Sequence, residues 1–117
     1  PFSKKKSYPG AYGPVIAVTA VDRTERSARY ATASDYIDIA APGVGIWPAV
    51  LGGGKAMSGT SIAAPVVTAD VAAAQRKLGL KTVGEIRAHL RKHTKDRGKP
   101  GRDRYTGWGL LELPPLC

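Results

Sequence analysis

Residues 58–74 read SGTSIAAPVVTADVAAA, a short polar turn followed by a long apolar run. Within the apolar part, the only polar side chains are those of Thr68 and Asp70. Pro65 falls about one turn in, where a missing N–H is tolerated because the first N–H groups of a helix have no intrahelical partner. A helix that is apolar on nearly every side is normally buried inside a larger protein. The run therefore predicts a long buried helix that begins next to Ser61.

The segments around this run predict the rest of an α/β fold with parallel strands. Apolar stretches that predict strands, rich in β-branched residues in the first case, lie at residues 15–21, 36–40 and 46–50. Gly79 is expected to end the long helix. A C-terminal amphipathic helix is expected from Thr82, because Glu85 follows at the spacing of a capping box. Residues 94–104 predict a basic loop.

The charge and composition of the chain limit its function classes. It carries 18 Lys and Arg against 9 Asp and Glu, with the positive charge concentrated at residues 4–6 and 77–104. A basic nucleic-acid-binding module is therefore an alternative. Aromatic residues are not interleaved with these charges as a stacking platform requires, so we expect no nucleic-acid partner. No apolar run approaches the roughly 20 residues that span a bilayer, so we expect no membrane span. The single cysteine, Cys117, cannot form an internal disulfide.

Ser61 is the candidate nucleophile. The start of a helix presents unpaired N–H groups and a partial positive charge, which can stabilise an oxyanion formed when the Ser61 hydroxyl attacks a carbonyl. Gly59 has no side chain and lets a substrate backbone approach closely. On spacing alone the alternative is that Thr60 and Ser61 merely cap the helix.

Four segments of the chain resemble the subtilase family of serine proteases. Residues 59–65, GTSIAAP, resemble the nucleophile motif of that family, G-T-S-(apolar)-A-(S or A)-P. Residues 8–12, YPGAY, resemble its Y-P-(A or G)-x-Y loop, and residues 37–43, IDIAAPG, its (V or L)-D-(I or V)-x-A-P-G segment. Residues 108–111, WGLL, resemble its closing segment. Because order and separations also match, residues 1–117 resemble the C-terminal part of a subtilase catalytic domain, with a partial subtilisin-like fold.

The resemblance implies a serine endopeptidase whose nucleophile is Ser61, with the Ser61 backbone N–H as one oxyanion donor. Gly59 and Thr60 would lie beside it in the oxyanion and substrate site. Ser7 and Gly10 would lie near the pocket for the substrate residue that precedes the cleaved bond. No catalytic metal is implied. The sequence departs from the family pattern after the motif, where Val66 replaces a His, Ala69 replaces a Gly and Asp70 follows.

The same resemblance implies no cofactor, apart from one weak cation site. The carbonyls of Gly10, Tyr12 and Val15, with the Asp38 carboxylate, could form it, and a structural role for Asp38 is the alternative. Pro9 matches a position that is often cis in the family.

The base and the acid that a nucleophilic serine needs are not recognisable in this chain. A triad requires a His oriented by an Asp, and in the family both precede the serine. The two histidines present, His89 and His93, are four apart on the second predicted helix. We expect them on a solvated basic helix face, with metal ligation and catalysis as alternatives.

We therefore expect the Asp- and His-bearing N-terminal part of the domain to lie outside this chain, and the fragment alone to be inactive. Its expected partners are that missing part and a polypeptide substrate. Without the missing part, exposed apolar surface predicts self-association or rearrangement. A catalytically dead interaction module is the other alternative. The resemblance suggests a secreted or periplasmic location.

Overall fold

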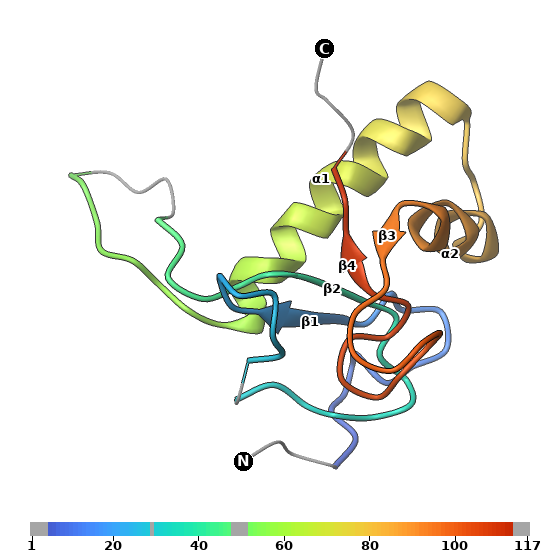
Figure 1. Ribbon diagram of the computed structural model, residues 1–117. Coiled ribbons are helices and arrows are strands. Elements are labelled where there is room, and N and C mark those ends of the chain that lie inside the picture. Colours follow the sequence, from blue (N-terminus) through green and yellow to red (C-terminus); the bar gives the residue numbers. More distant parts are fainter. Residues whose placement is uncertain (1–4, 29, 48–51, 114–117) are drawn as a thin grey trace.

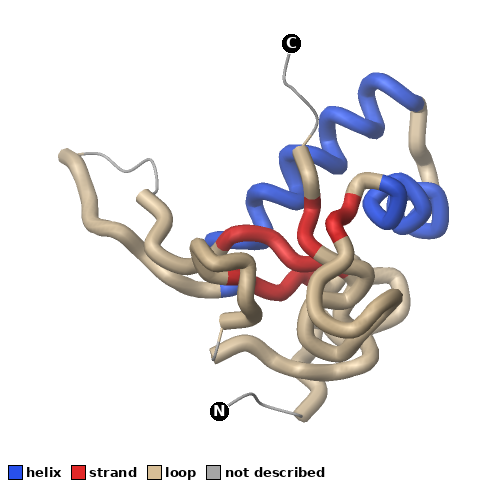
Figure 2. Tube along the Cα trace, in the orientation of Figure 1, coloured by secondary structure: helices blue, strands red, loops and turns tan. Residues whose placement is uncertain are grey.

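The computed structural model describes residues 5–28, 30–47 and 52–113. Four short strands form one sheet in the order β1-β2-β4-β3. The strands are β1 (Val18–Val21), β2 (Ile39–Pro42), β3 (Thr94–Lys95) and β4 (Leu110–Leu111). β1, β2 and β4 are parallel, and β3 pairs with β4 in the antiparallel direction. Figures 1 and 2 show that both ends of the chain thus contribute to one sheet, with the helices beside it.

Two helices carry the capping signals that the sequence predicts. α1 (Thr60–Leu78) ends at Gly79, which has a left-handed conformation and donates its N–H to the Gln75 carbonyl. α2 (Val83–Lys92) begins after Thr82, whose hydroxyl accepts the Glu85 N–H at 3.1 Å. The Glu85 carboxylate accepts the N–H of Lys81 at 2.9 Å, one residue before the expected partner. The predicted cap at Thr82 is therefore confirmed, and the reciprocal bond of Glu85 goes to the N–H of Lys81 in place of that of Thr82.

The core lies where α1 packs against β1 and β2. Its members are mostly small or β-branched residues of the sheet and of the two helices, including Ala20, Ile39, Ala63, Val67 and Leu90. Small side chains let the helix approach the sheet closely, and burial of the larger ones supplies the apolar stabilisation. The α/β class with parallel strands is confirmed.

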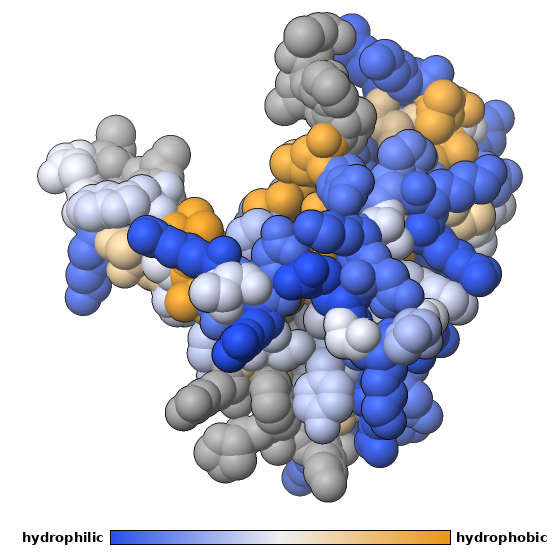
Figure 3. Space-filling model, in the orientation of Figure 1, coloured by the Kyte–Doolittle hydropathy of each residue, from blue (hydrophilic) through white to orange (hydrophobic). Residues whose placement is uncertain are grey.

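α1 is buried on one face in this chain, in keeping with the expectation that apolar helix surface is exposed without the N-terminal part. Among the described residues of α1, only Ala63, Val67, Asp70 and Ala74 are buried. These four share one helical face, which rests on the sheet and α2, whereas the opposite face is left open by the described residues. Figure 3 shows apolar surface gathered over α1 and the adjacent end of β4. Neither described helix has the length and hydropathy needed to cross a bilayer.

Four expected segments also differ from the structure. The first two strands cover residues 18–21 and 39–42. The expected basic loop begins with strand β3, which pairs with β4 near the end of the chain, where the His93 carbonyl accepts the Glu112 N–H at 2.7 Å. Of the expected strand at 46–50, Ile46 pairs with Met57 in an isolated bridge, and residues 48–50 lie outside the described residues. Cys117 and Lys4 lie outside them too.

A close approach at Gly43 joins the end of β2 to the start of α1. The Gly43 carbonyl accepts the Gly59 N–H at 2.8 Å and the Tyr30 hydroxyl at 2.7 Å. A Cβ at Gly43 would stand 2.6 Å from the Ala20 Cβ, 2.8 Å from the Gly59 carbonyl oxygen and 3.3 Å from the Ala63 Cβ. Position 43 therefore needs glycine, because helix start, β1 and β2 meet there.

Substituting Gly43→Ala should destabilise the fold by about 1–3 kcal/mol, because the added methyl forces the helix start away from β1. The measurement is the urea midpoint of unfolding followed by circular dichroism. Gly13→Ala is the matched control, since a Cβ there meets nothing within 4 Å. Equal midpoints for the two variants would contradict the steric argument.

Candidate active site

Ser61 lies at the start of α1 with its side chain exposed. Gly59 is the N-cap of this helix, and no side chain caps it. The Ile62 N–H bonds the Gly59 carbonyl at 3.0 Å, whereas the Ser61 N–H has no hydrogen-bond partner among the described residues. The interpretation of Thr60 and Ser61 as simple helix caps therefore finds no support. A free amide and the positive end of the helix dipole both stand beside the Ser61 hydroxyl.

A hollow of about 550 Å³ surrounds this position. Four of the five predicted site residues line it, namely Ser7, Gly10, Thr60 and Ser61. Gly59 is not part of the lining and instead positions the first turn through its bond to Gly43. The structure thus brings together residues more than 50 positions apart in the sequence, as a substrate pocket would require.

The loop that carries Ser7 and Gly10 is held by local bonds. The Tyr8–Pro9 peptide is cis, which confirms the expected conformation of Pro9. The Ser7 carbonyl accepts the Ala11 N–H at 2.8 Å, and the Ser7 N–H is donated to the Tyr36 hydroxyl at 3.2 Å. Tyr36 also lines the hollow, although no sequence motif singled it out.

The expected solvated face for the two histidines is wrong for His89. Its Nε2 atom lies 3.4 Å from Oδ2 of Asp70, and the side chains of His89 and Asp70 are 12% and 5% exposed. The His93 ring lies 4.5 Å from the His89 ring, and its Nδ1 is 2.8 Å from the His89 carbonyl oxygen. A buried carboxylate needs a polar partner, and α2 places the His89 imidazole within ion-pair distance of Asp70, although the two atoms form no hydrogen bond.

This contact also separates both histidines from the nucleophile. Asp70 follows Ser61 by nine positions on α1, which is about 13 Å along the axis. A general base must lie within about 3.2 Å of the proton that it takes, or act through one water. His89 is held at the level of Asp70, so it does not serve as the base for Ser61. Nor do the described residues contain a group of three His, Cys, Asp or Glu side chains that could hold a metal ion.

Arg87 occupies the region in which a cation was considered. Its guanidinium NH2 donates to the carbonyls of Gly13 and Val15 at 2.6 and 2.9 Å, and its Nε lies 3.3 Å from the Asp38 carboxylate. The other Asp38 oxygen accepts the Ala17 N–H at 2.8 Å. Arg87 therefore contacts two of the four oxygens named for the cation site, the Val15 carbonyl and the Asp38 carboxylate.

Sequence reasoning missed Arg87 because its partners, Gly13, Val15 and Asp38, lie 74, 72 and 49 positions earlier in the chain. On the predicted amphipathic helix it was one of several basic residues, and helical spacing does not identify which of them folds back onto a distant loop. The signal that the sequence does offer is Asp38, a charged residue within the mostly apolar strand expected at residues 36–40, because such a carboxylate needs a partner from elsewhere in the chain.

The comparisons with known proteins bear on this site. The model of the subtilase family matches residues 2–109. The chain belongs to the subtilase family. It is 34% identical over 110 residues to "Minor extracellular protease Epr" of Bacillus subtilis strain 168, an alignment that covers 93% of this chain and 17% of that protein. It is also 34% identical over 128 residues to "Fervidolysin" of Fervidobacterium pennivorans, covering 91% of this chain and 18% of that one.

Solved structures agree with this assignment. The crystal structure of fervidolysin, a keratinolytic enzyme related to subtilisin, matches with a TM-score of 0.79 and 33% identity, over 90% of this subtilase chain and 19% of that chain. "Sphericase" matches with a TM-score of 0.77 and 26% identity, over 97% and 46% of the two chains. The chain thus spans about a fifth of the length of Epr and of fervidolysin.

Removing the Arg87 side chain should destabilise the fold by about 1–3 kcal/mol, because the Asp38 carboxylate, only 10% exposed, loses a charged donor. Arg87→Lys should recover part of the loss, since an ammonium keeps the charge but not the fork of donors. The measurement is the urea midpoint of Arg87→Ala. Lys92→Ala, an exposed basic residue of the same helix, is the control and should stay within about 0.5 kcal/mol of the unsubstituted chain.

Proposed function

We propose that this chain supplies the nucleophilic serine of a subtilisin-like serine endopeptidase and forms the C-terminal part of its catalytic domain. The observation that carries the proposal is the position of Ser61: exposed, at the start of α1, with an unbonded amide beside it and a hollow in front. Family membership supports the reaction class, and the names of the relatives are those of proteases.

In this proposal the Ser61 hydroxyl attacks the carbonyl carbon of a peptide bond. A base from the missing N-terminal part takes the hydroxyl proton, and the oxyanion that forms is stabilised by the Ser61 N–H and the helix dipole. The amine then leaves with that proton, and water releases the acyl group from Ser61. Gly59 and Thr60 shape the approach to the carbonyl, while Ser7 and Gly10 line the pocket for the preceding substrate residue.

The fragment alone should be inactive, because neither histidine of the chain reaches Ser61. A hydroxyl without a base is a poor nucleophile, and loss of one triad member typically lowers the rate by orders of magnitude.

A direct test uses the intact parent protein. With an unstructured polypeptide as substrate, Ser61→Ala should lower kcat/KM by several orders of magnitude. Ser27→Ala is the matched control, since the Ser27 hydroxyl donates to the Tyr105 carbonyl outside the Ser61 hollow, and it should keep the parent's rate. The isolated 117-residue chain should show no hydrolysis above that of its own Ser61→Ala variant. A parent that keeps its rate without the Ser61 hydroxyl would refute the proposal.

The isolated chain should also self-associate, because the open face of α1 carries apolar residues such as Ala69, Ala72 and Ala73. Sedimentation velocity at several concentrations should show a mass that rises with concentration. Ala72→Glu on the open face should shift the chain toward the monomer, whereas Lys55→Glu on an exposed loop should not. A compact monomer that binds no hydrophobic dye would contradict this expectation.

A secreted location is part of the proposal and is supported by the name of the extracellular relative Epr. The relatives also include an "Intracellular serine protease" of Paenibacillus polymyxa, 33% identical over 91% of this chain and 34% of that protein. Location in the parent therefore depends on segments other than the protease fold.

A further inference from the structure

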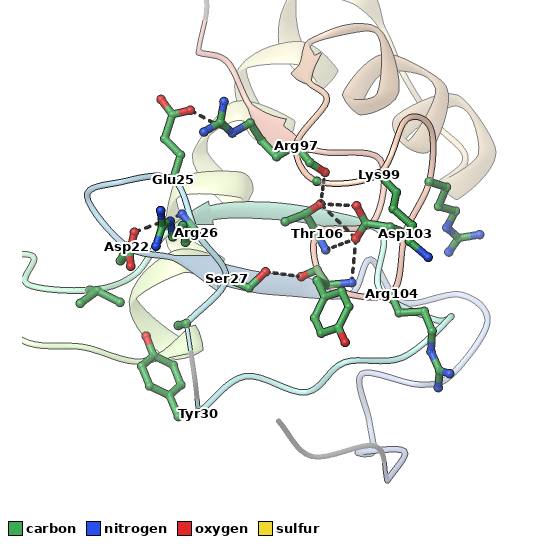
Figure 4. Close-up of a pocket in the computed structure, with 15 residues that line it drawn as sticks. Asp22, Glu25, Arg26, Ser27, Tyr30, Arg97, Lys99, Asp103, Arg104 and Thr106 are labelled. Atoms are coloured by element: carbon green, nitrogen blue, oxygen red, sulfur yellow. Dashed lines mark hydrogen bonds and ion pairs between the residues drawn. The ribbon is translucent and has the colours of Figure 1, made fainter. Parts of the chain in front are cut away.

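A second and larger hollow, of about 1090 Å³, lies away from the Ser61 hollow and shares no lining residue with it. One wall is the turn that follows β1, residues 22–28, together with Tyr30 and Val44. The other wall is the segment of residues 97–106 that precedes β4. Figure 4 shows side chains from both segments around it. We call this hollow the basic pocket.

Among the described residues, five cationic side chains line the basic pocket against three acidic ones, an excess of two positive charges. The cationic residues are Arg26, Arg97, Lys99, Arg102 and Arg104. The acidic residues are Asp22, Glu25 and Asp103. An excess of charge in a concave surface strengthens the local potential, because the protein walls exclude water from part of the field.

All three carboxylates already have partners within the fold. Asp22 accepts the Thr24 hydroxyl at 2.7 Å and the backbone N–H groups of Thr24 and Arg26 at 2.8 and 3.1 Å. The Thr24 hydroxyl bond, followed by the Arg26 backbone bond, lowers the pKa of Asp22, so this carboxylate is ionised near neutral pH. The Asp22 carboxylate therefore stabilises the turn after β1 and makes no ion pair with the cations of the opposite wall among the described residues.

The other two acids are used in the same way. Asp103 accepts the Tyr105 and Thr106 backbone N–H groups, both at 2.8 Å, and the Thr106 hydroxyl at 3.1 Å. Glu25 lies 3.2 Å from Nε of Arg97 and joins the two walls at one rim (Figure 4). Within the described residues, this is the one carboxylate of the hollow that pairs with a cationic side chain of its lining.

Three cations of the lining lack such partners. The Lys99 and Arg104 side chains make no hydrogen bond or ion pair with any described residue. Arg26 donates its backbone N–H to Asp22, and after the Thr24 and backbone hydrogen bonds its charge also lowers the pKa of that carboxylate, although the two side chains form no ion pair within the described part of the chain. Figure 4 places Arg26 on one wall and Lys99 and Arg104 on the other. These charges stand on separate walls, so a ligand that satisfies them must carry several separated anionic groups.

The pocket also offers apolar surface between its charges. Tyr30 and Tyr105 are each 48% exposed and line it together with Ala28 and Val44. The Tyr30 hydroxyl is donated to the Gly43 carbonyl, and burial raises the pKa of Tyr30, so the hydroxyl stays protonated while the ring faces the hollow. A ligand with carbon stems between its anionic groups fits this mixture of surfaces.

We propose that the basic pocket binds an acidic polypeptide segment, whose carboxylates pair with Arg26, Lys99 and Arg104 and whose backbone and side-chain stems lie against the two tyrosines. The hollow is much larger than a single small anion, and its cations stand apart. The three carboxylates of the walls oppose a continuous run of phosphates, whereas a peptide can place each of its anions beside a cation and keep neutral groups beside Asp22 and Asp103. The site is independent of the Ser61 chemistry.

The test is the binding of a fluorescently labelled peptide of alternating Glu and Gly to the purified chain. Fluorescence anisotropy is measured at about 0.1 M salt, where the Debye length is about 10 Å. The double variant Lys99→Glu/Arg104→Glu should weaken binding at least tenfold. The control is Lys55→Glu/Lys81→Glu, which makes the same change in net charge at exposed positions outside the pocket and should change the dissociation constant less than about twofold.

Circular dichroism establishes that each variant folds. Lys99→Gln/Arg104→Gln gives a second comparison, with a smaller loss of affinity, should the charge reversal disturb the fold. Equal weakening by both charge-reversed pairs would show that the peptide follows net charge alone and would overturn the proposal. It would equally be overturned if inorganic phosphate displaced the peptide at equal concentration, or if a DNA strand of matched charge bound more tightly and lost affinity in the pocket variant.

Discussion

The contact between Gly43 and the first turn of α1 governs the rest of this structure. Two donors converge on the Gly43 carbonyl, one from Gly59 and one from the Tyr30 hydroxyl. The absence of a side chain at position 43 lets β1, β2 and the helix start share one small volume. Ser61 is exposed at a fixed place because this junction sets both the position and the direction of the helix. The proposed chemistry therefore rests on a steric condition that lies outside the motif itself.

Two further interactions hold the distant segments around that junction. Arg87 on α2 binds the loop before β1 and the Asp38 carboxylate, and Arg102 donates to the Ile37 carbonyl at 3.1 Å. Arg91 lies over the Trp108 ring at 3.8 Å and so connects α2 to the segment that leads into β4. Positive charge in this chain therefore serves its internal architecture as well as its surface, which accounts for part of the strongly basic composition.

Local signals predicted from the sequence were accurate where the interaction itself is local. Gly79 ends α1 and Thr82 caps α2 because both effects involve residues at most four positions apart. The motif around Ser61 also predicted where the helix begins, and the family resemblance predicted that Ser7 and Gly10 lie near Ser61. Long-range pairing was not predictable: nothing in the spacing of His89 indicates that it faces Asp70, because that contact depends on how α2 crosses α1. The exposed apolar surface of α1 was expected, but which of its faces is buried was not, because composition reports what a helix can bury and not which neighbours cover it.

The contact between Asp70 and His89 has a consequence for the register of the two helices. The face that α1 turns toward the core is otherwise formed by Ala63, Val67 and Ala74, whose side chains offer no polar group to oppose a slide of α2 by one helical turn. Such a slide, about 5.4 Å, would separate the Asp70 carboxylate from the His89 imidazole and leave both buried without a polar neighbour. Within the described residues, this polar pair therefore acts beside the contacts of Arg87 and Arg91 in selecting one alignment of α2 along α1.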